Sequence, residues 1–339
     1  MSEVSFRWGF VGRGQGGCRI AQSFYSLGYK DCVFINTANV DLAGLDVPSE
    51  LKLLIGGHGD GAGKDPSIAE EAASNQREEI GDAIKALSDC DQVFICTGAG
   101  GGTGSGAALP VLEIAKMCLP SIPVGLISSM PAKQELVSDA TRKNAKNLLN
   151  VCCDLADSGE LSPFIVMDNE LVKKRVRPRS LRTLWIDGNL AFANILHKIN
   201  RLSATPTMLV SLDKADLKTL MFRSGTLFVG SREINNPEDR VLVEKHLNIA
   251  FTAGTVLHSD SPLKESDCAL VLTMPSRILD GDVRFFDLFT GVVNKYLTTM
   301  PNSYIHRGIY EDESRPAIRA TVLSIGDKSP RSKIVARLK

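Results

Sequence analysis

Short apolar runs alternate with helix-length amphipathic stretches along the first half of this chain. The stretch at 18–27 is typical of the helical ones, with apolar side chains at Ile20, Ala21, Phe24 and Leu27. Buried parallel strands appear in a sequence as continuous apolar runs, and parallel neighbours need helical crossovers. The pattern predicts strands at 6–11, 32–35, 51–55, 92–97, 124–128 and 164–167, and helices at 18–27, 67–87, 107–118 and 140–151. This alternation favours an α/β fold with a doubly wound, mostly parallel sheet.

The second half begins with a long apolar helix and then changes in texture. The helix is predicted at 184–202, strands at 208–212, 227–229, 269–273, 303–309 and 320–325, and helices at 239–250 and 282–297. We therefore expect a first domain at 1–183, a central connecting helix at 184–203 and a second, smaller α/β domain at 204–326. Residues 327–339 are expected to be a short, loose basic tail.

The composition narrows the class of protein. The chain has 339 residues with 39 basic and 39 acidic side chains, so no net charge draws it to nucleic acid or membrane. A signal peptide and a transmembrane segment are not expected, which favours the cytoplasm. The eight cysteines lack CxxC spacing and are interpreted as buried thiols, and we expect no protein-held transition metal. The basic segment 175–182 is interpreted as a solvated connector rather than a nucleic-acid patch, because aromatic residues that stack on bases are missing.

Three glycine-rich loops, at 12–17, 56–66 and 98–106, each lie between a predicted strand and a predicted helix. The third has six glycines in nine residues, which lets backbone N–H groups approach a ligand closely. The carboxyl ends of parallel strands meet at one sheet edge, so we expect the loops to converge there. Together they indicate a polyphosphate bound at helix N-termini, and the absence of GxxxxGK[ST] excludes the usual P-loop.

Gly12, Gly14 and Gly17 also satisfy GxGxxG, which raises the alternative of a dinucleotide-dependent oxidoreductase. Such enzymes usually carry an acidic residue at the end of the second strand to hold a ribose. Here that strand is followed by Asn36-Thr37-Ala38-Asn39, and Asp41 arrives too late in the chain. The oxidoreductase is therefore only a remote alternative.

The sequence GGGTGSG at 100–106 resembles the signature of the tubulin/FtsZ family. The loop at 12–17 resembles the first phosphate loop of that family, with Gln15 in the tubulin style, and 59–73 resembles the FtsZ loop that senses the γ-phosphate. Residues 167–170 resemble a tubulin segment whose Asn contacts guanine. The likeness runs from about residue 4 to residue 326.

This resemblance implies binding of GTP or GDP with Mg²⁺. The implied phosphate contacts are Gly14, Gln15, Gly16, Gly17, Cys18, Ala62, Gly63, Lys64, Gly98, Ala99, Gly100, Gly101, Gly102, Thr103, Gly104 and Ser105. The implied contacts to base and ribose are Asn169, Trp185, Asn189 and Glu135, with Trp185 in the position of an aromatic that stacks on guanine. The metal ligands are left unassigned.

The run at 211–218 resembles the catalytic loop of FtsZ and implies catalytic roles for Asp213 and Asp216. Taken alone, two acids three residues apart are more often an N-cap and a first-turn acid of a helix. The predicted helix from Asn189 to Leu202 is about 20 Å long and separates these acids from the nucleotide of their own subunit. Together with the resemblance, this predicts that the acids act on the next subunit of a head-to-tail filament.

Several departures from FtsZ bear on activity and partners. Ala38 replaces an acid and Ser211 replaces an Asn, which predicts altered Mg²⁺ handling and slower turnover. Lys64 replaces a small residue, and we leave open whether it meets a phosphate or solvent. The segment after Pro131 is longer, and residues 327–339 do not resemble the acidic linker or adaptor peptide of FtsZ.

The sequence therefore predicts a cytoskeletal GTPase for cell division, DNA segregation or intracellular positioning. The alternative is a polymerising or docking nucleotide-binding protein with little or no hydrolysis. Besides other copies of the chain, the basic tail at 327–339 could meet an adaptor, a lipid or nucleic acid, or have no partner.

Overall fold

The computed structural model describes residues 4–57, 59–176, 178, 180–281, 283–299, 304–314 and 316–339. Its strands are β1 (Trp8–Arg13), β2 (Cys32–Asn36), β3 (Lys52–Leu54), β4 (Gln92–Gly98), β5 (Val124–Met130), β6 (Phe164–Asp168), β7 (Thr226–Ile234), β8 (Asp267–Met274), β9 (Ile305–Glu311) and β10 (Ile318–Gly326). They form one ten-stranded sheet in the order β3-β2-β1-β4-β5-β6-β7-β10-β8-β9. The first strands run parallel, as continuous apolar runs with helical crossovers should.

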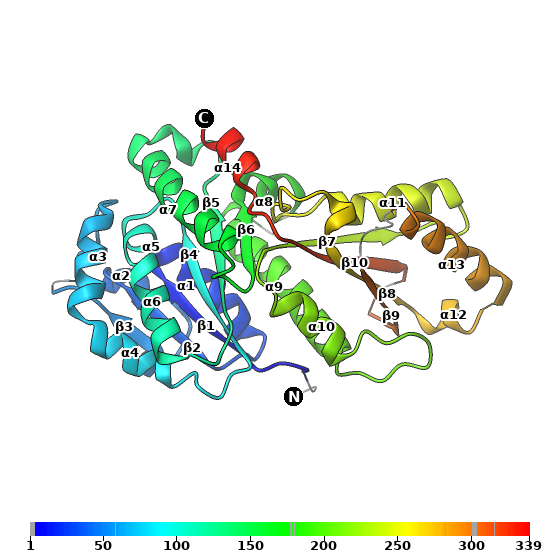
Figure 1. Cartoon of the computed structure of the whole chain (residues 1–339), viewed down its shortest axis with the longest axis horizontal. Helices are drawn as coiled ribbons and strands as arrows, with labels where there is room; N and C mark the ends of the chain where they lie inside the picture. The colour runs from blue at the N-terminus through cyan, green and yellow to red at the C-terminus, as the bar shows by residue number, and fades with distance from the viewer. Residues whose placement is uncertain are drawn as a thin grey trace.

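Helices cover both faces of the sheet (Figure 1). The face that packs on α1 (Gly14–Ser26) and α9 (Leu184–Leu202) carries an aromatic core around Trp8, Phe10 and Phe94. The opposite face packs on α3 (Pro66–Asn75), α4 (Arg77–Lys85), α6 (Ala108–Cys118), α7 (Asp139–Asp157) and α14 (Arg331–Leu338). The other helices are α2 (Asn39–Ala43), α5 (Gly102–Gly106), α8 (Asn169–Arg175), α10 (Lys214–Met221), α11 (Arg240–Thr252), α12 (Ser276–Leu279) and α13 (Val283–Leu297).

The two halves of the molecule meet along a narrow part of the sheet. Strand β7 pairs with β6 at a single position, Phe164 with Thr226. Beyond it, β10 runs antiparallel to β7 and β8, and β9 runs parallel to β8. Helix α9 runs between the halves, and the second half has an apolar core of its own beneath α11 and α13 (Figure 1). The predicted fold class, a mostly parallel α/β sheet with a second, smaller α/β part, is confirmed.

One predicted helix is interrupted. The helix expected at 67–87 breaks at Gln76, whose backbone leaves the helical region and whose side-chain oxygen accepts a 2.6 Å hydrogen bond from the Gly56 N–H. The break is therefore stabilised by satisfying a loop donor. The helix expected at 107–118 is confirmed as α6, and Gly102–Gly106 forms the separate short helix α5 ahead of it.

The strand predicted at 208–212 is wrong. Met208, Leu209 and Val210 are exposed, and the segment meets β9 through one backbone hydrogen bond, from the Ile309 N–H to the Val210 carbonyl. The hydroxyl of Thr207 also bonds the Ile309 carbonyl, so the chain stays beside the sheet edge without forming a ladder. Apolar character here marks an exposed loop, not a buried strand.

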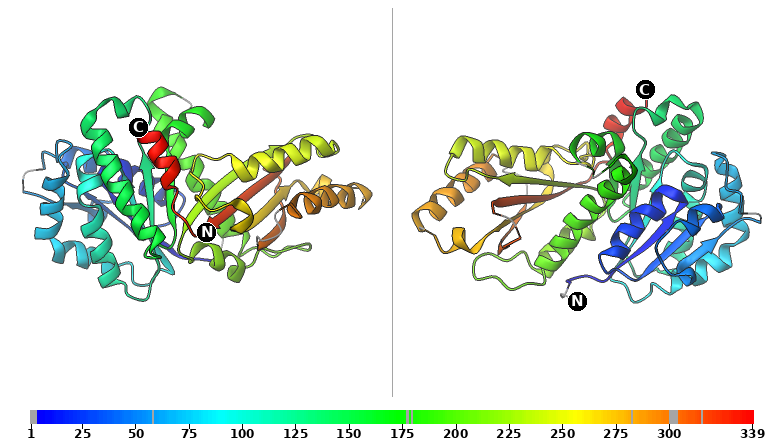
Figure 2. Two further views of the ribbon diagram at one scale, coloured as in Figure 1. Left: turned by 45° about the horizontal axis from the view of Figure 1, so that its top comes forward. Right: turned by 180° about the vertical axis from the view of Figure 1, so that it is seen from behind.

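The prediction of a loose basic tail is also wrong. Residues Arg331–Leu338 form helix α14, which lies against α7 in both views of Figure 2. Ile334 and Leu338 are buried in the main core, and Arg331, Lys333 and Arg337 pair with acidic residues of the body. A short amphipathic helix with apolar side chains four apart can bury one face, which a disordered tail cannot.

Some predictions fall outside the described residues. These are the helix start at Asp282, the strand start at Ser303, and Arg177 and Arg179 of the basic segment. All eight cysteines are free and seven are buried, as predicted. Within the described part of the chain, no helix is long and apolar enough to cross a membrane.

Candidate functional site

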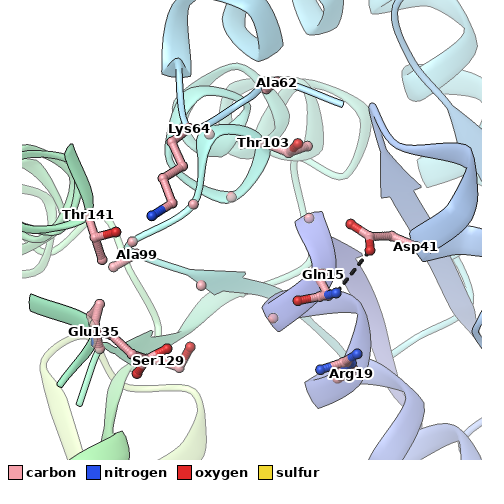
Figure 3. A pocket seen from close by; sticks show the side chains of 18 of the residues that line it. Gln15, Arg19, Asp41, Ala62, Lys64, Ala99, Thr103, Ser129, Glu135 and Thr141 are labelled. Atoms are coloured by element: carbon pink, nitrogen blue, oxygen red, sulfur yellow. Dashed lines mark hydrogen bonds between the residues drawn. The ribbon is translucent and has the colours of Figure 1, made fainter. Parts of the chain in front are cut away.

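The three glycine-rich loops converge on one cavity of about 680 Å³, as predicted from their places after parallel strands. Figure 3 shows it between the start of α1, the loop before α3 and the strand ends. Its lining includes most of the predicted contacts together with other residues: Gly14, Gln15, Gly16, Arg19, Ile20, Ala38, Asp41, Gly61, Ala62, Gly63, Lys64, Gly98, Ala99, Gly100, Gly101, Gly102, Thr103, Gly104, Ser129, Pro131, Gln134, Glu135, Ser138, Thr141, Asn169, Trp185 and Asn189.

Two helix N-termini open into this cavity. Helix α1 begins at Gly14 and α5 begins at Gly102, so the N–H groups of their first turns lack acceptors inside the helix. These groups suit an anion such as phosphate. Glycine is required because the helix starts touch: a Cβ on Gly14, whose φ is +62°, would lie 2.7 Å from the Gly104 nitrogen.

Three predicted contacts, Gly17, Cys18 and Ser105, do not line the cavity. A Cβ on Gly17 would lie 2.1 Å from the Cys96 carbonyl oxygen, so this glycine allows α1 to pack on β4. The Cys18 thiol is buried against the Ile35 carbonyl, and burial raises its pKa, while the Ser105 hydroxyl donates to the Ala99 carbonyl at 2.6 Å. The three residues therefore support the glycine-rich loops through packing and hydrogen bonds to the backbone.

Lys64 lies over the cavity. Its side chain extends toward Thr141 and Ala99 in Figure 3, and its Nζ is 3.3 Å from the Ser138 hydroxyl. The backbone of Lys64 has φ of +67° and its carbonyl accepts a 2.9 Å hydrogen bond from the Asn144 amide. Lys64 therefore lines the cavity with an exposed side chain, whose ammonium donates to Ser138.

Asp41 is a lining residue that the sequence analysis did not assign. Its carboxylate accepts a hydrogen bond from the Gln15 amide at 2.9 Å (Figure 3) and another from the Asn36 amide at 3.2 Å. It lies on the first turn of α2, three residues after Ala38, where the loss of an acid had been noted. An acidic side chain is therefore present three residues after Ala38, and helix α2 places both residues at the same cavity. The spacing of three residues between Ala38 and Asp41 could have indicated that Asp41 faces the same cavity, because residues three apart lie on one side of a helix.

A second group of side chains, from α8 and α9, also lines the cavity. Asn169 begins α8, and Trp185 and Asn189 lie four apart on α9, so one helix face offers both an indole and an amide. Glu135 also lines the cavity, with one carboxylate oxygen accepting from the Ala132 N–H at 2.7 Å. A flat ring beside two amides suits a nucleobase, which needs both stacking and edge recognition.

The two predicted catalytic acids lie outside the cavity. Asp213 is the N-cap of α10, and its carboxylate accepts from the Asp216 N–H at 2.8 Å. Asp216 reaches back to the Asp213 N–H at 3.3 Å, which completes a capping box. The capping role considered in the sequence analysis is therefore present. Helix α10 lies near the end of α9 that is farther from α8 (Figure 1). The structure therefore does not bring these acids to the cavity of the same chain.

His306 holds Asp216 from β9. Its Nδ1 is 2.7 Å from a carboxylate oxygen of Asp216, and its Nε2 is 3.0 Å from the Thr219 hydroxyl. The Tyr310 hydroxyl accepts from the Leu212 N–H at 2.8 Å and so fixes the preceding loop. Because His306 is distant in sequence, no local pattern indicated this contact.

Comparisons with known proteins agree with this geometry. A model described as the Tubulin/FtsZ family, GTPase domain, matches residues 9–175. Cell division protein FtsZ 2 of Haloferax volcanii is 30% identical over 313 residues, covering 83% of this chain and 74% of that protein. Cell division protein FtsZ 1 of Pyrococcus woesei is 28% identical over 329 residues, covering 88% and 86%.

A crystal structure of a GTPγS-form protofilament of TubZ from Bacillus thuringiensis serovar israelensis has the same fold. Its TM-score is 0.82 at 20% identity, over 99% of this chain and 92% of that chain. The fold, the converging glycine-rich loops and the sequence identity agree with one another. The chain belongs to the tubulin/FtsZ family of GTPases.

Proposed function

We propose that this protein is a cytoplasmic GTPase that assembles head to tail into filaments and hydrolyses GTP where two subunits meet. The observation that carries the proposal is that the predicted catalytic acids lie apart from the cavity of their own chain. The phosphate and base contacts gather in one cavity, whereas Asp213 and Asp216 cap a helix beyond the far end of α9. A second subunit stacked on the first would unite them, and a contact of this kind continues into a filament.

Exposed apolar side chains at both ends support such stacking. Beside the nucleotide cavity, Val40 and Val137 are 81% and 78% exposed. Beside the capped acids, Met208, Leu209 and Val210 are exposed as well. Apolar side chains that flank a catalytic group and a ligand pocket are suited to burial against a second copy of the chain. The relative TubZ, which has this fold, forms protofilaments.

Within the proposed site, each group has a distinct task. The free N–H groups of α1 and α5 and the Lys64 ammonium would bind the phosphates. Mg²⁺ fits this cavity, because it usually binds through one or two carboxylates together with phosphate oxygens, and Asp41 with the Thr103 hydroxyl offers such donors. The cation would neutralise charge on the transferred phosphoryl group. Asp213 and Asp216 of the next subunit would orient the attacking water.

The test is phosphate release from GTP measured against protein concentration, with polymer measured by sedimentation in the same samples. We expect a steep threshold in turnover at the concentration where polymer appears. Asp213→Ala and Asp216→Ala should each lower turnover per pelleted subunit about 100-fold, which is typical for loss of a positioned acid or base. Wild-type turnover in polymer of either variant would overturn the catalytic assignment.

Asp239→Ala is the matched control. Asp239 also caps a helix in the second half, by accepting from the Val241 and Leu242 N–H groups. That helix is α11, which lies apart from α10 (Figure 1). Its replacement should cost about 1 kcal/mol of stability and leave turnover unchanged. Pelletable polymer of the wild-type protein without a turnover threshold would instead favour the alternative of a polymerising protein with little hydrolysis.

A further inference from the structure

A fully buried arginine lies directly behind the phosphate loops. Arg13 is the last residue of β1 and precedes Gly14, the first residue of α1, yet its side chain is 0% exposed and does not line the cavity. Its Nη1 donates a 3.0 Å hydrogen bond to the Gly104 carbonyl, which also accepts from the Thr97 hydroxyl at 2.7 Å. The guanidinium is therefore separated from the cavity by a single turn of α5.

The charge of this guanidinium is not balanced by the protein. Its Nε and Nη2 have no hydrogen-bond partner, and among the described residues no carboxylate forms an ion pair with it. The titratable groups that act on it are three thiols, Cys18, Cys96 and Cys152. Burial raises the pKa of Cys152 to about 12 and those of the other two further, so all three are neutral at pH 7.

Arg13 itself remains charged. Burial lowers its pKa to about 9, which is still above neutral pH. An unpaired buried cation is costly, because the charge has lost its water and gained no counter-ion. The cost is reduced if a ligand of opposite charge binds close by in a region of low dielectric. The phosphates expected at the starts of α1 and α5 are the nearest place for such a ligand.

We propose that Arg13 is the counter-charge of the bound nucleotide: a buried cation that favours ligands in proportion to their number of phosphate groups. The inference rests on the proposed nucleotide site and adds to it a specificity-determining residue that does not itself line the cavity. Arg13 acts through the field of its charge and by fixing the Gly104 carbonyl from behind. This predicts that nucleoside diphosphates and triphosphates bind more tightly than monophosphates.

The experiment compares wild type with Arg13→Met, which keeps the length of the side chain and removes the charge. Kd values for GDP and GMP are measured by calorimetry, and thermal unfolding is measured without nucleotide. We expect Kd for GDP to rise at least tenfold in the variant and Kd for GMP to rise less. Without nucleotide, the unfolding midpoint should be unchanged or higher, because removing an unpaired buried charge does not destabilise.

Arg13→Lys and Arg13→Gln provide a second comparison that does not depend on the folding of the Met variant. The lysine variant retains the charge and should bind GDP within a few-fold of wild type, whereas the glutamine variant should behave as the Met variant does. Arg7→Met is the control, because it removes a charge just before the start of the same strand, where Arg7 pairs with Asp31 at 2.7 Å. It should leave both Kd values unchanged.

The outcomes separate this inference from the function on which it rests. If the wild-type protein bound neither GDP nor GTP, the proposed nucleotide site would fail. If the wild type bound GDP and the neutral variants bound it equally well, only the inference would fail. Equal weakening of GDP and GMP, or a lower unfolding midpoint with unchanged Kd, would assign Arg13 a packing role and overturn the proposal.

Discussion

At the scale of single residues, Asp41 is in an unusual position for a carboxylate. It lines a cavity built to attract phosphate, and the Gln15 and Asn36 amides hold both of its oxygens. A carboxylate beside phosphates is repelled unless a cation lies between them. Mg²⁺ binds in this way, through one or two carboxylates and the phosphates of the substrate. The position of Asp41 is therefore suited to binding Mg²⁺ when GTP and Mg²⁺ bind together.

We predict that Asp41→Asn weakens the Mg²⁺ dependence of GTP binding. The amide keeps the size of the side chain but cannot offer a charged ligand, so the gain in GTP affinity on adding Mg²⁺ should fall about tenfold. Titration of GTP with and without Mg²⁺ measures this gain. Asp46→Asn, on an exposed residue just after α2, should behave as wild type. An unchanged Mg²⁺ effect in the Asp41 variant would remove this residue from the cation site.

The residues that could be assigned from sequence share one property, which is that local chain geometry determines their position. The glycine loops follow strands, and Trp185 and Asn189 are four apart on one helix, so their convergence could be predicted from spacing. Arg13 and His306 could not be assigned in this way. Their significance depends on Gly104 and Asp216, which are distant in sequence, and no periodicity records such contacts.

At the scale of elements, α14 ties the end of the chain to the nucleotide half. Arg337 binds Asp168 through two hydrogen bonds of 3.1 and 3.2 Å, and only 3% of the Asp168 side chain is exposed. Asp168 also caps α8 by accepting from the Glu170 N–H at 2.8 Å. Because Asn169 follows directly and lines the cavity, the helix at the chain end supports the base-binding end of the site.

We predict that Arg337→Met destabilises the protein by about 2–4 kcal/mol, because it leaves a buried carboxylate without its counter-ion. Chemical denaturation measures the change in the free energy of unfolding. Arg331→Met is the matched control on the same helix, since its partners Asp154 and Asp157 are 72% and 41% exposed. Its cost should stay below about 1 kcal/mol. Equal costs for the two variants would show that the Asp168 pair has no special weight.

Helices and strands could be predicted correctly where the apolar residues of a pattern are buried in the structure. The pattern was misleading where they are exposed. Continuous apolar runs correctly indicated the parallel strands, because both faces of those strands are covered. The run at 208–212 has the same composition, but Met208, Leu209 and Val210 lie exposed beside β9, and only Leu212 at its end is buried. Conversely, the charged stretch that forms α14 folds because Ile334 and Leu338 bury one of its faces, and Arg331, Lys333 and Arg337 pair with carboxylates of other elements.

At the scale of the whole molecule, the joint between the halves is narrow. Besides the single β6–β7 pair, residues 255–257 run beside β6, with hydrogen bonds from the Asp168 N–H to Thr255 and from the Leu257 N–H to Val166. His258 follows this segment and stacks on Phe228 of β7, with ring centroids 3.4 Å apart. A charged imidazole would be unfavourable here, so the joint depends on a neutral histidine.

This dependence predicts that acid loosens the molecule at the joint. Burial, with Lys333 nearby, lowers the pKa of His258 from 6.5 to about 4. The unfolded chain therefore takes up a proton near pH 6.5 and the folded chain only near pH 4. Between these values the unfolded state binds more protons, so stability is full above pH 6.5 and falls as the pH is lowered toward 4.

His258→Phe keeps the stacked ring and removes the titrating group. Over this range the wild type should lose up to about 3 kcal/mol more of its free energy of unfolding than the variant. Denaturation curves at pH 7, 5.5 and 4.5 measure the difference, which should grow at each step. Parallel pH profiles for the two proteins would mean that His258 titrates alike in the folded and unfolded chains, and the acid sensitivity of the joint would then have to come from other groups.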